Sequence, residues 1–156
     1  MEKEICADRS CENTAHGHSW QRERARSQAL AQLESIKEMV EALEEGAYMD
    51  DNAARGDERT DREELAREAI QNDALDIQVR SDWASSVEEM SADWYTILLC
   101  TGGPAVRIKG KLSDMTATTA QLEYQDWGTP WTRLDGLTQE DIDALLTYAR
   151  CFYFGE

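Results

Sequence analysis

The segment from residue 94 to residue 131 constrains the fold of this chain most strongly, because three strand patterns follow one another in it. Residues 94–100 form the densest apolar run in the sequence, and the Gly-Gly-Pro at 102–104 is typical of a hairpin turn. In residues 106–112 apolar and basic residues alternate, which predicts a strand with one solvated face. In residues 120–125 apolar residues alternate with Gln and Glu, which predicts a third strand. We therefore predict an antiparallel β-meander at the centre of the fold.

Helical patterns flank this meander on both sides. Apolar residues recur at spacings of three and four over residues 19–46, and Gly46 lies where such a helix would end. A capping box that begins at Thr60 predicts a second helix to about Asp73, and residues 76–83 alternate as a first strand. A last helix follows its cap residue, Thr138. The prediction is an α+β fold with two acidic N-terminal helices, a four-stranded antiparallel β-meander and a C-terminal helix packed on the sheet.

The 156 residues divide into three predicted parts. Residues 1–18 show no periodicity and are expected to form a flexible N-terminal arm. Residues 19–73 form an acidic helical region, and residues 74–156 form the α+β core. A chain of this length builds one core of ordinary size, so we expect residues 19–73 and 74–156 to belong to one domain.

The net charge of −16 limits the classes of partner. Such a charge opposes direct binding to nucleic acid and to anionic membrane surfaces, and it favours basic protein partners. No apolar run approaches the roughly 18–20 residues of a membrane helix. The first residues also lack the basic-then-apolar order of a signal peptide. We therefore expect a cytoplasmic protein whose cysteines are reduced thiols.

Four potential metal ligands lie close together near the N-terminus. Cys6, Cys11, His16 and His18 supply the nitrogen and sulfur donors that zinc binds, in a C-x4-C-x4-H-x-H spacing. This spacing differs from the usual paired ligands of zinc sites, so a tail without metal is the competing interpretation. No cofactor other than zinc is indicated.

Acidic residues crowd the helical region. Residues 34–73 contain 14 acidic residues against 5 basic ones. A helical hairpin here would present a dense acidic ridge. The candidate partner-binding residues on it are Glu34, Glu38, Glu41, Glu44, Glu45, Asp50, Asp51, Glu63 and Glu64.

Two further features admit a structural and a functional interpretation. Trp127 and Trp131 flank a Gly and a Pro, so they either cap the edge of the core or form a contact surface. The basic stripe of Arg107, Lys109 and Lys111 either pairs with acidic neighbours such as Glu123 or binds an anionic ligand. The sequence contains no catalytic or phosphate-binding motif, and we do not expect an enzyme.

Four segments resemble a family of small uncharacterised proteins carried by phages, prophages and plasmids. The segments are residues 74–83, 98–108 (LLCTGGPAVRI), 122–131 (LEYQDWGTPW) and 148–156 (YARCFYFGE), which together span roughly the last half of the chain. The resemblance implies a mobile-element setting, in which small acidic proteins often block host defence as anti-CRISPR or anti-restriction proteins. It assigns no functional residue.

The leading hypothesis is an anti-CRISPR type inhibitor that occupies the basic nucleic-acid site of a host defence complex through its acidic surface. Carboxylates along a helix can replace phosphates against Lys and Arg side chains. One alternative is a metal- or ligand-binding regulatory module built on the N-terminal Cys and His residues. Another is an accessory protein whose partner is unknown.

Overall fold

The computed structural model describes the backbone of residues 12–52 and 62–155 and the side chains of residues 19–49 and 62–155. Its elements, in chain order, are α1 (Glu12–Asn52), α2 (Arg62–Asp73), β1 (Asp76–Arg80), a 3-10 turn (Val87–Glu89), β2 (Trp94–Cys100), β3 (Ala105–Ser113), β4 (Thr116–Ala117), β5 (Gln121–Gln125), β6 (Thr132–Arg133) and α3 (Gln139–Ala149). None of these helices is long and apolar enough to cross a membrane.

The predicted α+β fold is confirmed. The sheet is antiparallel in the order β1-β2-β3-β5-β6, and β4 pairs with the end of β3. The four predicted strands correspond to β1, β2, β3 and β5. The sheet has six strands rather than four because the turns after β3 and β5 add β4 and β6, which have two residues each.

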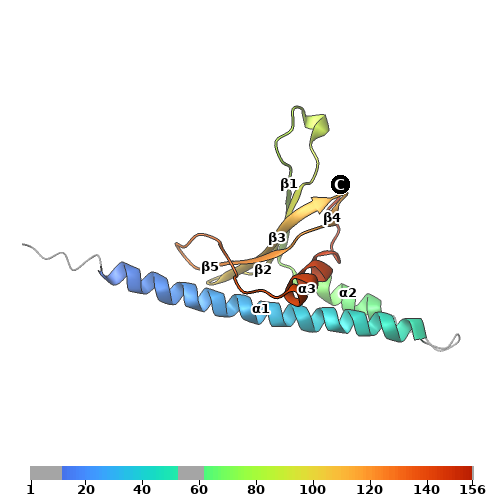
Figure 1. Cartoon of the computed structure of the whole chain (residues 1–156), viewed down its shortest axis with the longest axis horizontal. Coiled ribbons are helices and arrows are strands. Elements are labelled where there is room, and N and C mark those ends of the chain that lie inside the picture. The colour runs from blue at the N-terminus through green and yellow to red at the C-terminus, as the bar shows by residue number, and fades with distance from the viewer. Residues whose placement is uncertain (1–11, 53–61, 156) are drawn as a thin grey trace, which may run out of the picture.

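One face of the sheet forms the core with the helices. In β2, Tyr95, Ile97 and Leu99 are buried, and they lie beside Ile108 of β3 and Leu122 of β5 on the same face. Figure 1 shows α1 running along the base of the molecule below the sheet, with α2 beside its second half. Helix α3 packs against both α1 and β5.

Helix α1 is longer than the sequence predicted. It begins at Glu12, inside the stretch expected to be a flexible arm, and it continues through Gly46 to Asn52. Gly46 is buried at the contact with α2, where an added Cβ would lie 2.8 Å from the backbone of Arg62 and of Glu63. This glycine therefore permits two helices to approach closely and does not end the first one. The predicted cap residue Thr60 lies outside the described residues.

The first strand is shorter than predicted and leads into a projecting arm. β1 ends at Arg80 rather than Trp83, and the chain turns where the Asp82 amide donates to the Asp93 carboxylate at 2.8 Å. Residues 81–93 form the arm, which projects away from α1 in Figure 1. All five residues of β1 are exposed, because the described helices do not reach this edge of the sheet.

The cap of α3 is the one that the sequence predicts. The Thr138 hydroxyl accepts from the Asp141 amide, and the Asp141 carboxylate accepts from the Thr138 amide at 2.9 Å. Asp141 therefore occupies the position that Glu or Gln takes in the usual capping box. The same helix is tied to α2, since the Tyr148 hydroxyl donates to Asp73 at 2.7 Å.

Candidate partner-binding site

The candidate glutamates of α1 lie together on one exposed surface. Glu34, Glu38, Glu41 and Glu45 are all exposed, and their spacings of four, three and four residues place them on one side of the helix. The buried residues Leu33, Ile36, Val40 and Leu43 occupy the opposite side. With a rise of ~1.5 Å per residue, these four charges extend over ~16 Å of helix axis.

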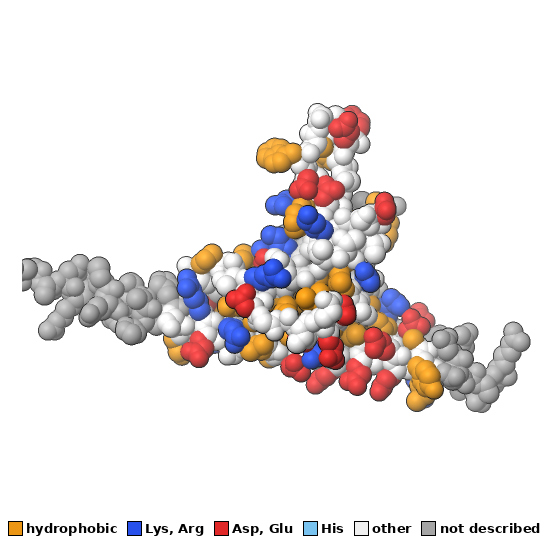
Figure 2. Space-filling model, viewed as in Figure 1, with side chains coloured by type: hydrophobic (Ala, Val, Ile, Leu, Met, Phe, Trp, Pro, Cys, Tyr) orange, Lys and Arg blue, Asp and Glu red, His pale blue; other side chains and the backbone are white. Residues whose placement is uncertain are grey.

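Helix α3 extends this surface. Glu44 points to the side of α1 where Glu140 and Asp143 of α3 lie, and with Glu41 these residues line a groove of about 470 Å³ between the helices. Figure 2 shows acidic side chains gathered along the base of the molecule, where α1 and α3 lie. We call this array the acidic surface, and its members are Glu34, Glu38, Glu41, Glu44, Glu45, Glu140 and Asp143.

One cation lies within the acidic surface, and its charge is already neutralised. The Lys37 ammonium is 3.2 Å from an Asp141 carboxylate oxygen and 3.8 Å from one of Glu34. The hydrogen bond with Asp141 and the nearby Glu34 raise the pKa of Lys37. Hydrogen bonds from Thr138, with a smaller contribution from Lys37, lower the pKa of Asp141.

The remaining charges of the acidic surface are uncompensated. Within the described residues, no Lys or Arg lies within ion-pair distance of Glu38, Glu41, Glu44 or Glu45. The surface is therefore a dense, solvated array of negative charge.

The other acidic candidates, Glu63, Glu64, Asp50 and Asp51, are not members of the acidic surface. Glu63 accepts from Arg67 at 2.8 Å within α2, so its charge is partly neutralised. Glu64 is exposed on the same helix. Asp50 and Asp51 lie in the last turn of α1, outside the residues whose side chains the structure describes.

The predicted metal ligands lie outside the described side chains. Cys6 and Cys11 lie outside the described residues, and His16 and His18 belong to the first turns of α1, whose side chains are not described. In the parts of the chain that are described, no three His, Cys, Asp or Glu side chains form a group suited to a metal ion.

The basic stripe lies on the open face of the sheet. The predicted pairing is confirmed for Arg107, which donates to Glu123 at 2.7 Å and stacks 4.1 Å from the ring centre of Trp131. The ammonium nitrogens of Lys109 and Lys111 lie 5.8 and 5.0 Å from the centre of the Trp94 ring. The stripe therefore contacts aromatic rings more than carboxylates.

The two predicted tryptophans have different environments. Trp127 is 73% exposed, so the core-capping interpretation is wrong for this residue, whereas Trp131 is half-buried under Arg107. Trp127 lies in the turn after β5, beside the Gly102-Gly103 turn, and both turns line a shallow pocket of about 220 Å³. Two of the segments that carry the family resemblance thus meet at one end of the sheet.

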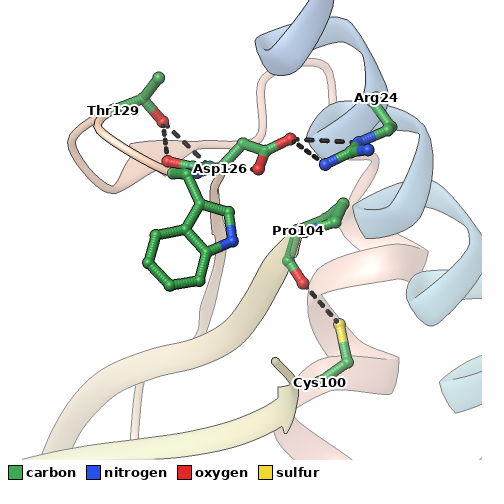
Figure 3. Close-up of polar contacts among 6 residues, drawn as sticks. Arg24, Cys100, Pro104, Asp126 and Thr129 are labelled. Atoms are coloured by element: carbon green, nitrogen blue, oxygen red, sulfur yellow. Dashed lines mark hydrogen bonds and ion pairs between the residues drawn. The ribbon is translucent and has the colours of Figure 1, made fainter. Parts of the chain in front are cut away.

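A partly buried ion pair holds this end of the sheet on α1. Arg24 donates to one carboxylate oxygen of Asp126 from Nη2 at 2.9 Å and from Nε at 3.2 Å (Figure 3). The other carboxylate oxygen accepts from the Trp127 amide, and the Thr129 hydroxyl bonds both the amide and the carbonyl of Asp126. The side chain of Asp126 is fully buried. Arg24 and Asp126 therefore fix the position of the exposed Trp127.

Sequence reasoning missed four residues of these two surfaces. Glu140 and Asp143 belong to the C-terminal helix, and only the packing of α3 on α1 brings them to Glu41 and Glu44. Arg24 and Asp126 are 102 positions apart, and no local pattern joins them. No local signal could have found Arg24, because α1 begins at Glu12 and Arg24 therefore lies well inside the helix, beyond the first turn where a cation would oppose the helix dipole.

Known proteins supply no further assignment. No family model matches the chain, and neither the curated proteins nor the solved structures give a match.

Proposed function

We propose that this protein is a mobile-element inhibitor of a host defence nucleoprotein complex, of the anti-CRISPR type, which binds the basic nucleic-acid site of its target. The observation that carries the proposal is the acidic surface on α1 and α3, in which Glu38, Glu41, Glu44 and Glu45 have no Lys or Arg within ion-pair distance among the described residues. The target would be a protein or ribonucleoprotein whose Lys and Arg side chains normally contact phosphates.

The charge density of the surface supports this kind of target. Four carboxylates over ~16 Å of α1 give about one charge per 5 Å, compared with about one per 3.4 Å along a single DNA strand. Glu44, Glu140 and Asp143 add a second row beside the first, on the groove side. The backbone of α1 is already ordered, so binding a partner would cost side-chain rotamer entropy but little backbone entropy.

The test is competition with DNA for a purified, guide-loaded CRISPR effector complex, carried out over a panel of effector types. We expect the protein to reduce DNA binding by one effector, and we expect its affinity for that effector to fall steeply with salt. The variant Glu38→Gln, Glu41→Gln, Glu44→Gln, Glu45→Gln removes four charges and keeps helix propensity nearly unchanged. Each exposed pair contributes only about 0–1 kcal/mol, so the four must be changed together. This variant should fold normally and lose inhibition.

The matched control removes four exposed charges elsewhere, by Glu23→Gln, Glu68→Gln, Glu88→Gln and Asp135→Asn. It has the same net charge as the first variant and should inhibit like the wild type. Equal inhibition by the wild type and the first variant, together with loss of inhibition in Trp127→Ala, would contradict the proposal. The contact surface would then be the Trp127 end of the sheet.

A further inference from the structure

We propose that β1 binds β1 of a second copy of this chain, so that two sheets join edge to edge in a symmetric dimer. β1 is the edge strand of the sheet, and among the described strands it pairs with β2 alone. All five of its residues are exposed, and no other described segment forms a backbone hydrogen bond with its outer side. An exposed strand edge presents unpaired amide and carbonyl groups, which favour pairing with another strand. This inference does not depend on the proposed function.

The sequence of β1 complements itself in the antiparallel direction. It reads Asp-Ile-Gln-Val-Arg, from Asp76 to Arg80. When two copies pair about Gln78, Asp76 of each copy lies opposite Arg80 of the other, and Ile77 lies opposite Val79. The dimer thus gains two pairs of opposite charges and two apolar pairs, which are the cross-strand contacts that stabilise a sheet.

The symmetry of this pairing also preserves the two faces of the sheet. A two-fold axis through the Gln78 pair, perpendicular to the sheet, leaves Ile77 and Val79 on the same face as the core residues Ile97 and Tyr95. Ile77 and Val79 are 38% and 50% exposed in the single chain, which is unusual for the core side of a sheet. Pairing would cover them, and because the contact is between identical surfaces it closes at two copies.

The arm after β1 provides a second part of the same interface. Its side chains Trp83, Val87 and Met90 are among the most exposed apolar residues of the molecule, and Trp83 has no buried surface. In the proposed register Ser81 lies opposite Leu75 of the partner, which is itself 59% exposed just after α2. The arm of each copy would therefore extend toward the end of α2 in the other. Exposed apolar patches of this kind mark interaction surfaces.

The net charge of each copy sets the conditions for the dimer. Two chains of net charge −16 repel each other at low salt, so the dimer should be stronger when salt screens the charges. The acidic surface lies on the solvent side of α1, and in Figure 1 α1 is at the base of the molecule while β1 rises away from it.

The test uses charge reversal in a cycle, measured by sedimentation equilibrium of the full chain in about 0.15 M salt. Asp76→Arg alone places two positive charges opposite each other at both ends of the paired strands. Arg80→Asp alone does the same with two negative charges. Each should raise the dimer dissociation constant at least ~10-fold. The combined variant Asp76→Arg, Arg80→Asp restores both opposite-charge pairs and should return the constant to within ~3-fold of the wild type. A partner other than a second β1 would not produce this rescue.

A cross-linking experiment tests the same pairing without charge reversal, in case the charge-reversal variants alter the fold of β1. In a Cys6→Ser, Cys11→Ser background, Gln78→Cys should give covalent dimers with a short bifunctional thiol reagent, because directly opposed residues have Cβ atoms ~5 Å apart. Thr96→Cys, on the same face of the neighbouring strand β2, is the matched control and should not. The proposal is overturned if the wild type remains monomeric up to about 1 mM. Failure of rescue in a folded double variant, or equal cross-linking of both cysteine variants, overturns it as well.

Discussion

At the scale of single residues, Asp126 does the most to connect distant parts of the chain. Its carboxylate lies in the interior, yet it accepts from Arg24 on α1 and from the amide of Trp127 in its own turn. A buried carboxylate without its partners would carry the cost of removal from water, so these hydrogen bonds are required for the turn to pack as it does. The pair joins the first half of α1 to the end of the sheet.

We predict that Arg24→Met lowers the free energy of unfolding by about 1–2 kcal/mol, because the Asp126 carboxylate loses its cation while the aliphatic stem is kept. The arginine side chain is 45% exposed, and water can replace part of what it provides, which keeps the loss below that of a fully buried pair. Urea denaturation measures the change. Arg26→Met, two residues further on the same helix, should stay within ~0.5 kcal/mol of the wild type. An equal effect of both changes would show that the ion pair is not the cause.

At the scale of secondary structure, the strands have two unlike faces even where the sequence is mostly apolar. In the apolar run of β2 only Tyr95, Ile97 and Leu99 are buried. The alternate residues Thr96 and Leu98 face the open side with the basic stripe. No described helix covers this side, so apolar character alone did not decide burial.

This difference gives a direct test on adjacent residues. Ile97→Ala removes a fully buried side chain and should cost about 2–5 kcal/mol, through lost transfer energy and a cavity. Leu98→Ala, on the half-buried open face, should cost about half as much or less. Thermal and urea unfolding of the two variants measure this order. A larger loss for Leu98→Ala would mean that the open face is covered in the folded protein.

At the scale of the whole molecule, the acidic surface is one of two regions with several exposed acidic side chains, the other being the arm of residues 81–93. The acidic surface lies along α1 and α3, while Figure 2 shows Lys and Arg side chains gathered over the sheet and the first half of α1. Like charges at helical spacings of three and four residues repel one another. Repulsion within the acidic surface therefore lowers the stability of the folded protein.

We expect the melting temperature of the wild type to rise between about 10 mM and 200 mM sodium chloride, because salt screens the repulsion within the acidic surface. The four-Gln variant of α1 should melt higher than the wild type at low salt and show a shallower rise. Differential scanning calorimetry compares the two. A melting temperature that falls with salt would indicate that ion pairs such as Lys37–Asp141 outweigh the repulsion.

The sequence alone determined the features that depend on near neighbours. Local sequence patterns predicted α2, the four main strands and α3, although the first strand ends three residues earlier than predicted, and the Thr138 cap followed from its local sequence. That the candidate glutamates of α1 share one side of the helix could also be predicted from the sequence, since helical spacing decides which residues share a side. These properties need only the geometry of a single helix or strand.

Only the tertiary structure decided what depends on residues far apart in the chain. Gly46 was predicted to end α1, and its contact with α2 shows why the helix continues. The packing of α3 brought Glu140 and Asp143 to the acidic surface, and the fold joined Arg24 to Asp126 and left Trp127 exposed. The burial and pairing of a side chain depend on which distant segment packs against it, and a local sequence pattern contains no information about that packing.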